Sequence, residues 1–293
     1  MKLYTTIKPK LAISFSGGRT SAVMTKLCVE RFSDTHDIVI TFANTGCEHE
    51  ETLKFIDRCD KYFKWGVVWL EAVVNPKKGK GIRHKIVSFK TAARKGEPFE
   101  EYIAKYGMPD RNHNHCTSRL KEDVMYSYRR ELGWGRTEYY TAIGIRADEI
   151  DRVSSKRIEK KLVYPLVEWG WTKDDVKREC VKWPFDLQLK GEHYGNCVWC
   201  WKKSHRKLQT LALEDPSVFD FPEKMEFLHE WTNNTDANPR RFFRGRKSVA
   251  DIKAAAAAGG FKIYSDTEIR EPDPELDFGS ACGESCEIGA DYE

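Results

Sequence analysis

The chain has 293 residues, of which 40% are hydrophobic and 32% charged, and its formal net charge is +4. This composition is typical of a folded protein with a sizeable core, and it excludes a largely disordered chain. The net charge is too small to indicate nucleic-acid binding by itself, and no apolar run approaches the ~20 residues that a membrane span needs. Because residues 1–10 also lack a secretory pattern, we expect a cytoplasmic protein with no membrane partner.

The first half of the chain alternates short β-rich runs with helical patterns. Strands are predicted at residues 11–15, 37–42 and 67–74, and helices begin near residues 20 and 48. This βαβαβ order favours an α/β fold in which helices cover both faces of a parallel sheet. Another strand is predicted at residues 139–145, and Thr172 is predicted to cap the helix that follows it.

The middle and the end of the chain have different compositions from the first half. Residues 75–114 are rich in Lys, Arg and Gly, and outside a predicted helix at residues 98–106 we expect much of this stretch to be a mobile lid over the site, or else a solvated connector. Residues 204–293 are predicted to form a helical extension after a first domain of residues 1–203. The extension contains a basic stretch at residues 239–247, an alanine-rich helix that ends at Gly259, and an acidic tail.

The sequence SFSGGRTS, at residues 14–21, joins the first predicted strand to the first predicted helix. A strand, a glycine turn and a helix N-terminus together form an anion-binding site, because backbone N–H groups and the positive helix end face the turn. Gly17 and Gly18 would let the backbone approach a phosphate closely. The available hydroxyl donors are Ser14, Ser16, Thr20 and Ser21. The stretch matches neither the Walker loop nor the dinucleotide-binding pattern, and an ordinary Ser/Gly turn is the alternative interpretation.

Further segments follow this turn in a characteristic order. They are NTG at residues 44–46, CTSRLK at 116–121, GIRADE at 144–149 with Arg152, and PLVEWGWTKDDV at 165–176. With them, residues 11–203 resemble the adenine nucleotide alpha-hydrolase (PP-loop) superfamily, and within it the phosphoadenosine phosphosulfate (PAPS) reductase family. The resemblance implies a Rossmann-like nucleotide-binding domain over residues 1–203, followed by the cysteine-bearing extension.

The resemblance also implies which residues bind the nucleotide. These are Ser14, Ser16, Gly17, Gly18, Arg19, Thr20, Ser21, Asn44, Thr45, Gly46, Gly144, Arg146 and Arg152. The chain departs from the family pattern at Arg19-Thr20, where many relatives have Lys-Asp, and at Asn44, which replaces an Asp. These departures leave the substrate open between PAPS and ATP, and ATP would require Mg²⁺.

The cysteine spacing points to a metal centre. Cys197 and Cys200 form a C-x-x-C turn that places two thiolates on one side, and adjacent lysines favour the thiolate forms. Cys116 begins a helix-like segment, whose N-terminus favours its thiolate. By resemblance to cysteine-rich members of the family, these three would hold a four-iron four-sulfur (4Fe-4S) cluster, which requires a fourth thiolate.

The fourth ligand is not fixed by the spacing. Cys286 and Cys282 are the leading candidates, with Cys180 behind them. Because His115 stands where relatives often have a second cysteine, a histidine ligand or a zinc site is the alternative, and a protein without metal is a third possibility. The remaining cysteines, Cys28, Cys47 and Cys59, are expected to be buried.

Three functions fit these patterns. The first is a PAPS-reductase-like enzyme that uses a thiol reductant, with Cys282 or Cys286 as the attacking thiol, because Ala281-Cys282-Gly283 is faintly similar to the family's mobile E-C-G tail. An incidental pair of cysteines in a disordered tail is the alternative there. The second function is ATP-dependent sulfur transfer from a sulfur donor to tRNA, DNA or a small molecule. The third is a non-catalytic nucleotide sensor or nucleic-acid-associated protein, suggested by the basic and aromatic residues 240–247. A solvated basic face is the alternative interpretation of that stretch.

Overall fold

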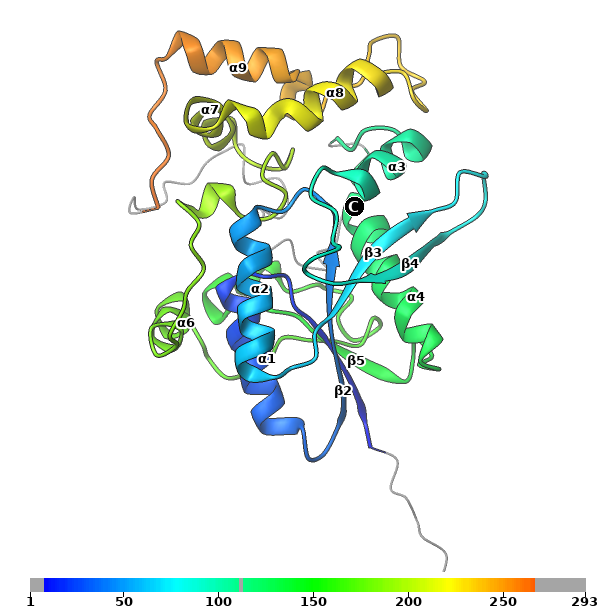
Figure 1. Ribbon diagram of the computed structural model, residues 1–293, viewed down its shortest axis with the longest axis vertical. Helices are drawn as coiled ribbons and strands as arrows, with labels where there is room; N and C mark the ends of the chain where they lie inside the picture. Colours follow the sequence, from blue (N-terminus) through cyan, green and yellow to red (C-terminus); the bar gives the residue numbers. More distant parts are fainter. Residues whose placement is uncertain (1–7, 111–112, 267–293) are drawn as a thin grey trace, which may run out of the picture.

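The computed structural model describes residues 8–110 and 113–266, which form a six-stranded sheet covered by helices (Figure 1). The strands are β1 (Lys10–Ser14), β2 (Asp37–Asn44), β3 (Val68–Val74), β4 (Ile82–Val87), β5 (Tyr139–Ala142) and β6 (Leu162–Val163). Their order in the sheet is β4-β3-β2-β1-β5-β6, and only β4 runs antiparallel to its neighbour. The order reverses between β1 and β5, and in open α/β sheets ligands bind at such a switch point, beyond the carboxyl ends of the strands.

Helices cover both faces of the sheet, which confirms the predicted α/β class. One face carries α1 (Arg19–Phe32), α2 (Glu50–Phe63) and α6 (Lys173–Cys180). The other carries α3 (Glu97–Tyr106) and α4 (Asp123–Glu131). The helices α7 (His205–Glu214), α8 (Asp220–His229) and α9 (Val249–Ala258) lie next to α3, beyond the ends of the parallel strands (Figure 1). Shorter helical segments are Ser118–Glu122, Ala147–Arg152, α5 (Pro165–Glu168), Glu192–Tyr194, Pro216–Phe219 and Arg244–Arg246. Successive residues of a strand point to opposite faces of the sheet: Trp69 packs with α1 and α2, whereas Leu70 packs with α3 and α4.

Local capping explains several of the helix ends. The predicted cap at Thr172 is confirmed, because its side chain and that of Asp175 form a reciprocal capping box at the start of α6. At the start of α2, the ring of His49 accepts the backbone N–H of Glu51 at 3.1 Å. The alanine-rich helix α9 ends, as expected, at Gly259, which has a φ of +70°.

The middle of the chain differs from its prediction. Residues 82–87 pair with β3 in register from Val87 to Ile82, and α3 occupies residues 97–106. The helix predicted at residues 98–106 is therefore confirmed, whereas part of the stretch expected to be an irregular lid is the strand β4, because Ile82 buries apolar surface against the sheet.

The C-terminal helices share their hydrophobic core with the sheet. Leu208 of α7, Met225 of α8 and Ile252 of α9 belong to the same cluster as Leu70 of β3 and Ile103 of α3. Figure 1 shows these three helices as a layer beside α3, at the end of the sheet where the parallel strands finish. A domain boundary at residue 203 stays a prediction. Among the described residues, no helix has the length and apolar character needed to cross a bilayer.

Candidate functional site

The turn between β1 and α1 has the geometry of an anion site. Gly17 has a φ of +86°, and a Cβ there would lie 2.7 Å from both Ile56 Cδ1 and Thr52 Cγ2, so only glycine fits against α2. Gly18 caps α1 in an extended conformation, with no side-chain cap and no acidic residue in the first turn. The first N–H groups of α1 therefore lack an intrahelical acceptor, and the positive end of the helix dipole is not neutralised by its own helix.

Hydroxyl groups hold this turn in shape. Ser21 Oγ donates to the Gly18 carbonyl at 3.0 Å and accepts from Ser16 Oγ at 2.9 Å. Ser14 lies apart from them, since its hydroxyl is buried and donates to Met125 Sδ at 3.7 Å. Of the predicted hydroxyl donors, Ser16 and Ser21 thus belong to the turn, whereas Ser14 faces α4.

The end of β5 lies directly against the start of α1. A Cβ at Gly144 would come 2.9 Å from Ser21 Cα, so glycine is what permits this close approach. Arg146, two residues later, is only 6% exposed, and its Nη1 donates to Thr20 Oγ1 at 3.0 Å. The structure thus brings a buried guanidinium to the N-terminus of α1, as the predicted nucleotide site requires.

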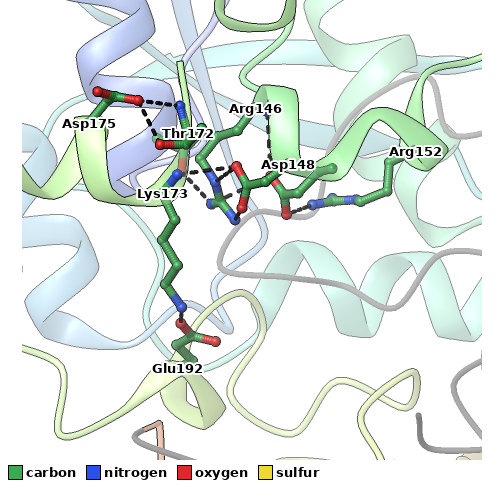
Figure 2. A network of polar contacts seen from close by, with 9 residues as sticks. Arg146, Asp148, Arg152, Thr172, Lys173, Asp175 and Glu192 are labelled. Carbon is green, nitrogen blue, oxygen red and sulfur yellow. Dashed lines mark hydrogen bonds and ion pairs between the residues drawn. The ribbon is translucent and has the colours of Figure 1, made fainter. Parts of the chain in front are cut away.

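A polar network holds Arg146 in place (Figure 2). Its Nε and Nη2 donate to Asp148 at 3.0 and 3.2 Å. Partial burial raises the pKa of Asp148, but hydrogen bonding and charge from Arg146 outweigh it and leave that pKa below its usual value. The backbone N–H of Lys173 also donates to Asp148, at 3.1 Å, which connects the network to α6.

The second predicted arginine joins the same network. Arg152 Nη1 lies 2.6 Å from Glu149 Oε1, while Glu149 Oε2 lies 3.4 Å from Arg146 Nη1. Figure 2 shows Arg152 on the opposite side of this cluster from Lys173, whose ammonium pairs with Glu192. Arg152 therefore supports the position of Arg146 through their shared carboxylate partner.

Arg19 has a different role from the one expected of it. Its guanidinium makes a two-pronged ion pair with Asp186, at 2.7 and 3.0 Å, and also donates to the Leu187 carbonyl at 2.7 Å. Arg19 thus binds the segment that follows α6 to the start of α1. A phosphate at the turn would have to share this guanidinium with Asp186.

The loop after β2 explains why Asn stands at position 44. Asn44 is fully buried, and its amide nitrogen donates to Glu71 Oε1 at 2.7 Å and to the Ala93 carbonyl at 2.9 Å. An Asp at this position would face the buried carboxylate of Glu71 and could not donate to it. The Asn44 side-chain oxygen accepts the Gly46 N–H at 3.3 Å, which shapes the NTG turn.

Thr45 connects the candidate nucleotide loop to the cysteine motif. Its backbone N–H and its hydroxyl donate to the two carboxylate oxygens of Glu48, at 2.9 and 2.8 Å. The same hydroxyl lies 3.4 Å from Cys197 Sγ. Because Glu48 and Cys197 also form an isolated antiparallel bridge, the NTG loop and the C-x-x-C turn lie side by side.

The predicted cluster ligands meet at one pocket. Cys116, Cys197 and Cys200 all line it, although the first lies in another part of the chain. Apolar side chains, including Phe99, Leu120, Trp199 and Trp201, form most of the remaining wall. Lys121 and Lys202 also line the pocket, and no carboxylate does. Three thiols in an apolar pocket with cationic neighbours are a donor set that suits an iron–sulfur cluster.

The other metal predictions fare differently. Cys180 is buried in the hydrophobic core beneath α1 and α2, beside Cys59, so it does not reach the pocket. His115 is exposed and is not part of the pocket wall. Across residues 8–110 and 113–266, no three His, Cys, Asp or Glu side chains are grouped to hold one metal ion. Cys282 and Cys286 lie outside the described residues.

Cys47 is the neighbour of this site that sequence reasoning missed. It is buried, as expected, but its carbonyl accepts the Val198 N–H at 3.0 Å, which places it beside the C-x-x-C turn. Burial raises the pKa of the Cys47 thiol well above its usual value, and the adjacent Cys197 and Glu48 raise it further. The position of Cys47 directly after the NTG motif was the available signal.

The basic and aromatic residues 240–247 do not form the stacking surface that the third hypothesis needs. Phe242 and Phe243 are 0% and 2% exposed and belong to the hydrophobic core. Arg240 is buried and donates to the backbone carbonyl of Asn233 at 2.7 Å, while Arg241 pairs with Glu230 at 2.7 Å. The expectation was wrong because it took composition as a sign of exposure.

Comparisons with known proteins agree with the α/β fold. The family described as "Phosphoadenosine phosphosulfate reductase domain" matches residues 10–90. The uncharacterized nin region protein ORF290 of Escherichia phage lambda is 32% identical over 281 residues, which cover 94% of each chain. The uncharacterized proteins MJ0066 and MJ0973 of Methanocaldococcus jannaschii are each 25% identical, over 74% and 54% of this chain. The chain spans only 41% and 33% of the length of those two proteins.

Proposed function

The chain belongs to the phosphoadenosine phosphosulfate reductase domain family, and on that premise we propose that it acts on the phosphate or sulfonate end of an adenine nucleotide. The observation that carries the proposal is the buried Arg146 guanidinium at the N-terminus of α1, 3.0 Å from Thr20 Oγ1. A helix N-terminus and a guanidinium both favour a bound phosphate. The negative charge of the nucleotide would lie against residues 16–21, at the switch point between β1 and β5.

The proposed reductase reaction needs an attacking thiol besides the three pocket cysteines, and Cys282 or Cys286 is the predicted one. In the reductase reaction, a cysteine thiolate attacks the sulfur of the nucleotide's sulfonate, so that an S–S bond forms while the S–O bond to the phosphate breaks. A second thiolate then attacks the cysteine sulfur, and sulfite leaves with the electron pair of the S–S bond. The resulting disulfide is reduced by an external dithiol. Arg146 and the start of α1 would stabilise the charge on the departing phosphate.

Cys116, Cys197 and Cys200 would hold an iron–sulfur cluster, with Cys286 as the predicted fourth ligand. Each thiolate of a four-iron cluster binds a different iron, so its ligands lie further apart than those of one zinc ion. What supports this choice is the lining of the pocket, where the three thiols lie beside Lys121 and Lys202 among apolar side chains. When bound, the cluster would supply a redox-active centre beside the nucleotide.

The first experiment measures the nucleotide affinity of the variant Gly18→Val. Gly18 lies in an extended conformation that valine can adopt, so the variant is expected to fold and to lose at least tenfold in affinity for PAPS and ATP. Gly81→Val is the matched control, because Gly81 has open space around it and lies in another loop. Unchanged nucleotide affinity in folded Gly18→Val would show that the phosphates do not bind at residues 16–21.

Turnover by anaerobically purified protein is the second experiment. Sulfite released from PAPS in the presence of a dithiol would support the reductase. Loss of sulfite release in Cys282→Ser or Cys286→Ser, with the iron content unchanged, would identify the attacking thiol, whereas loss of iron in Cys286→Ser would identify that residue as the fourth ligand. The second candidate function is ATP-dependent sulfur transfer to a nucleic acid, which the exposed basic hairpin β3–β4 favours. In that case the protein would release pyrophosphate from Mg²⁺-ATP, and no sulfite would form from PAPS.

A further inference from the structure

The hairpin formed by β3 and β4 has an unusual charge distribution. From residue 72 to residue 96 the sequence contains eight Lys or Arg residues and no Asp or Glu. Figure 1 shows this hairpin extending beyond the edge of the sheet, with its turn away from the helices α1 and α2. A long exposed arm with one sign of charge is costly in self-repulsion unless a partner of opposite charge binds it.

The cations at the tip of this arm remain available to a partner. Lys77, Lys78, Lys80 and Arg83 are exposed, and none has a carboxylate within ion-pair distance in the described part of the chain. By contrast, Lys85, nearer the body, pairs with Glu71 at 3.0 Å. The free charge is therefore concentrated at the turn, which we call the basic tip: Lys77, Lys78, Lys80 and Arg83.

A hollow of about 670 Å³ lies between the basic tip and the end of α4. Lys80, Arg83 and Arg130 are its charged wall residues, and the wall contains no carboxylate. Carboxylates on neighbouring elements have partners of their own: Glu101 accepts the Val74 N–H at 3.3 Å, and Glu131 lies 3.3 Å from His84 Nε2. The hollow thus adds a third element, α4, to one continuous cationic surface.

We propose that the basic tip and Arg130 bind the phosphate backbone of double-stranded DNA, with the β3–β4 ribbon directed into the major groove. Lys and Arg side chains supply the phosphate contacts, and a two-stranded ribbon fits the major groove of B-form DNA, which is about 12 Å wide. The major groove of A-form RNA is too deep and narrow for such an arm.

The arm lacks the features that single strands require. Binding of single-stranded nucleic acid relies on exposed aromatic rings on which bases stack. Apart from His84, the aromatic residue between 72 and 96 is Phe89, and its ring packs against Trp69 at a centroid distance of 6.1 Å. The arm therefore offers charge without a stacking platform, which favours a duplex.

The position of the arm relates DNA binding to the candidate site. Because β3 runs parallel to β2 and β1, the basic tip follows the same edge of the sheet at which residues 14–21 begin. In the register of the sheet, Ser14 is level with Thr41, and Thr41 is level with Val68, where β3 begins. Because β3 continues to Val74, it ends about 20 Å further along the strand direction than β1, at about 3.3 Å per residue. DNA held by the arm would therefore lie beyond the nucleotide site, past the edge of the sheet at which residues 14–21 begin.

The test is fluorescence anisotropy of a labelled 20-base-pair DNA duplex with the full chain at several salt concentrations. The variant K77Q/K78Q/K80Q is expected to bind about tenfold or more weakly at 0.1 M salt, and to lower the slope of log affinity against log salt by up to about 2.7. The control K61Q/K64Q/K177Q removes the same charge from exposed positions on α2 and α6 and should bind like the unaltered chain.

Two further measurements make the test decisive. R83Q/R130Q, which removes the two arginines that line the hollow, should also weaken DNA binding, and an RNA duplex or a single strand should compete less well than the DNA duplex. Equal affinity of K77Q/K78Q/K80Q and its control would overturn the proposal, as would stronger competition by RNA. DNA binding that survives in Gly18→Val, and nucleotide binding that survives in K77Q/K78Q/K80Q, would show that the proposed DNA site and the proposed nucleotide site are independent.

Discussion

Two basic stretches of this chain, at residues 77–83 and 240–247, look alike in the sequence and differ in the structure. Both are short, rich in Lys and Arg, and interrupted by glycine. The first is the exposed turn of the β3–β4 hairpin. In the second, Arg240 and both phenylalanines are buried, and Arg241 pairs with Glu230.

The difference arises from neighbours that are distant in the chain. The C-terminal stretch packs against α8 and its capping residue Glu230: Glu226 accepts the Phe242 N–H at 3.3 Å and the Val249 N–H at 3.0 Å, and Glu230 pairs with Arg241. At the tip of the hairpin, by contrast, no carboxylate of the described residues pairs with a lysine or arginine side chain. A basic stretch thus becomes part of the core where carboxylates and apolar surface meet it, and a binding surface where they do not.

The largest expected effect is on the buried stretch. Phe242→Ala should lower the free energy of unfolding by about 3–5 kcal/mol, because Phe242 is 0% exposed and packs against Trp199 at 5.0 Å between ring centroids. Phe227→Ala on α8 is the matched control, since Phe227 is 86% exposed. Denaturant unfolding measures both, and equal stability of the two variants would contradict the placement of Phe242 in the core.

Arg240→Met should have the next largest effect, about 1–3 kcal/mol of destabilisation. The guanidinium donates to backbone carbonyls of Tyr106, Met108 and Asn233, and methionine would leave these buried acceptors without that donor. The exposed Arg246 is the control, and Arg246→Met should stay within about 0.5 kcal/mol. The DNA affinity of folded Arg240→Met should be unchanged. A loss of affinity would mean that the C-terminal basic stretch also binds DNA, as the hairpin is proposed to do.

Much of the fold could be predicted from the sequence, because its strands and helices carry clear local signals. The apolar runs that became β1, β2 and β3 and the cap at Thr172 depend on nearby residues only. The strand β4 was missed because its apolar positions alternate with Arg83, His84 and Lys85, a pattern that reads as a solvated loop until β3 is placed beside it.

The site was predictable where a contiguous motif carries it and not where distant segments meet. The turn at residues 16–21 could be found because strand, glycines and helix follow one another. The pairing of Arg19 with Asp186 and the approach of Cys47 to Cys197 depend on how loops cross in space. The stacking role of Phe242 failed for the same reason, since exposure is a property of the folded chain.

The pH dependence of stability gives a smaller but sharper test of the buried stretch. Burial raises the pKa of Glu226 above its ordinary value of 4.5, although backbone N–H groups of Val249 and Phe242 oppose the shift. The carboxyl group of Glu226 therefore binds its proton more tightly in the folded state than in the unfolded state. The stability that this difference contributes is complete below pH 4.5 and is lost as pH rises through the raised pKa. Glu226→Gln should remove this loss, and unfolding curves at pH 4 to 7 would show it. Identical pH profiles for the variant and the unaltered chain would place the Glu226 carboxylate in water.

The smallest expected effect on stability belongs to the exposed tip. K77Q/K78Q/K80Q should change the free energy of unfolding by no more than about 0.5 kcal/mol, because these side chains have no carboxylate partner in the described chain to lose. Any change should be a slight stabilisation at low salt, since the substitutions relieve repulsion between like charges, and it should vanish as salt screens them. Thermal melts at 0.02 and 0.5 M salt would measure it. A marked loss of stability would mean that the three lysines stabilise the folded state. The contrast with Arg240 would then no longer hold, because Arg240 is expected to stabilise the chain without contributing to DNA affinity.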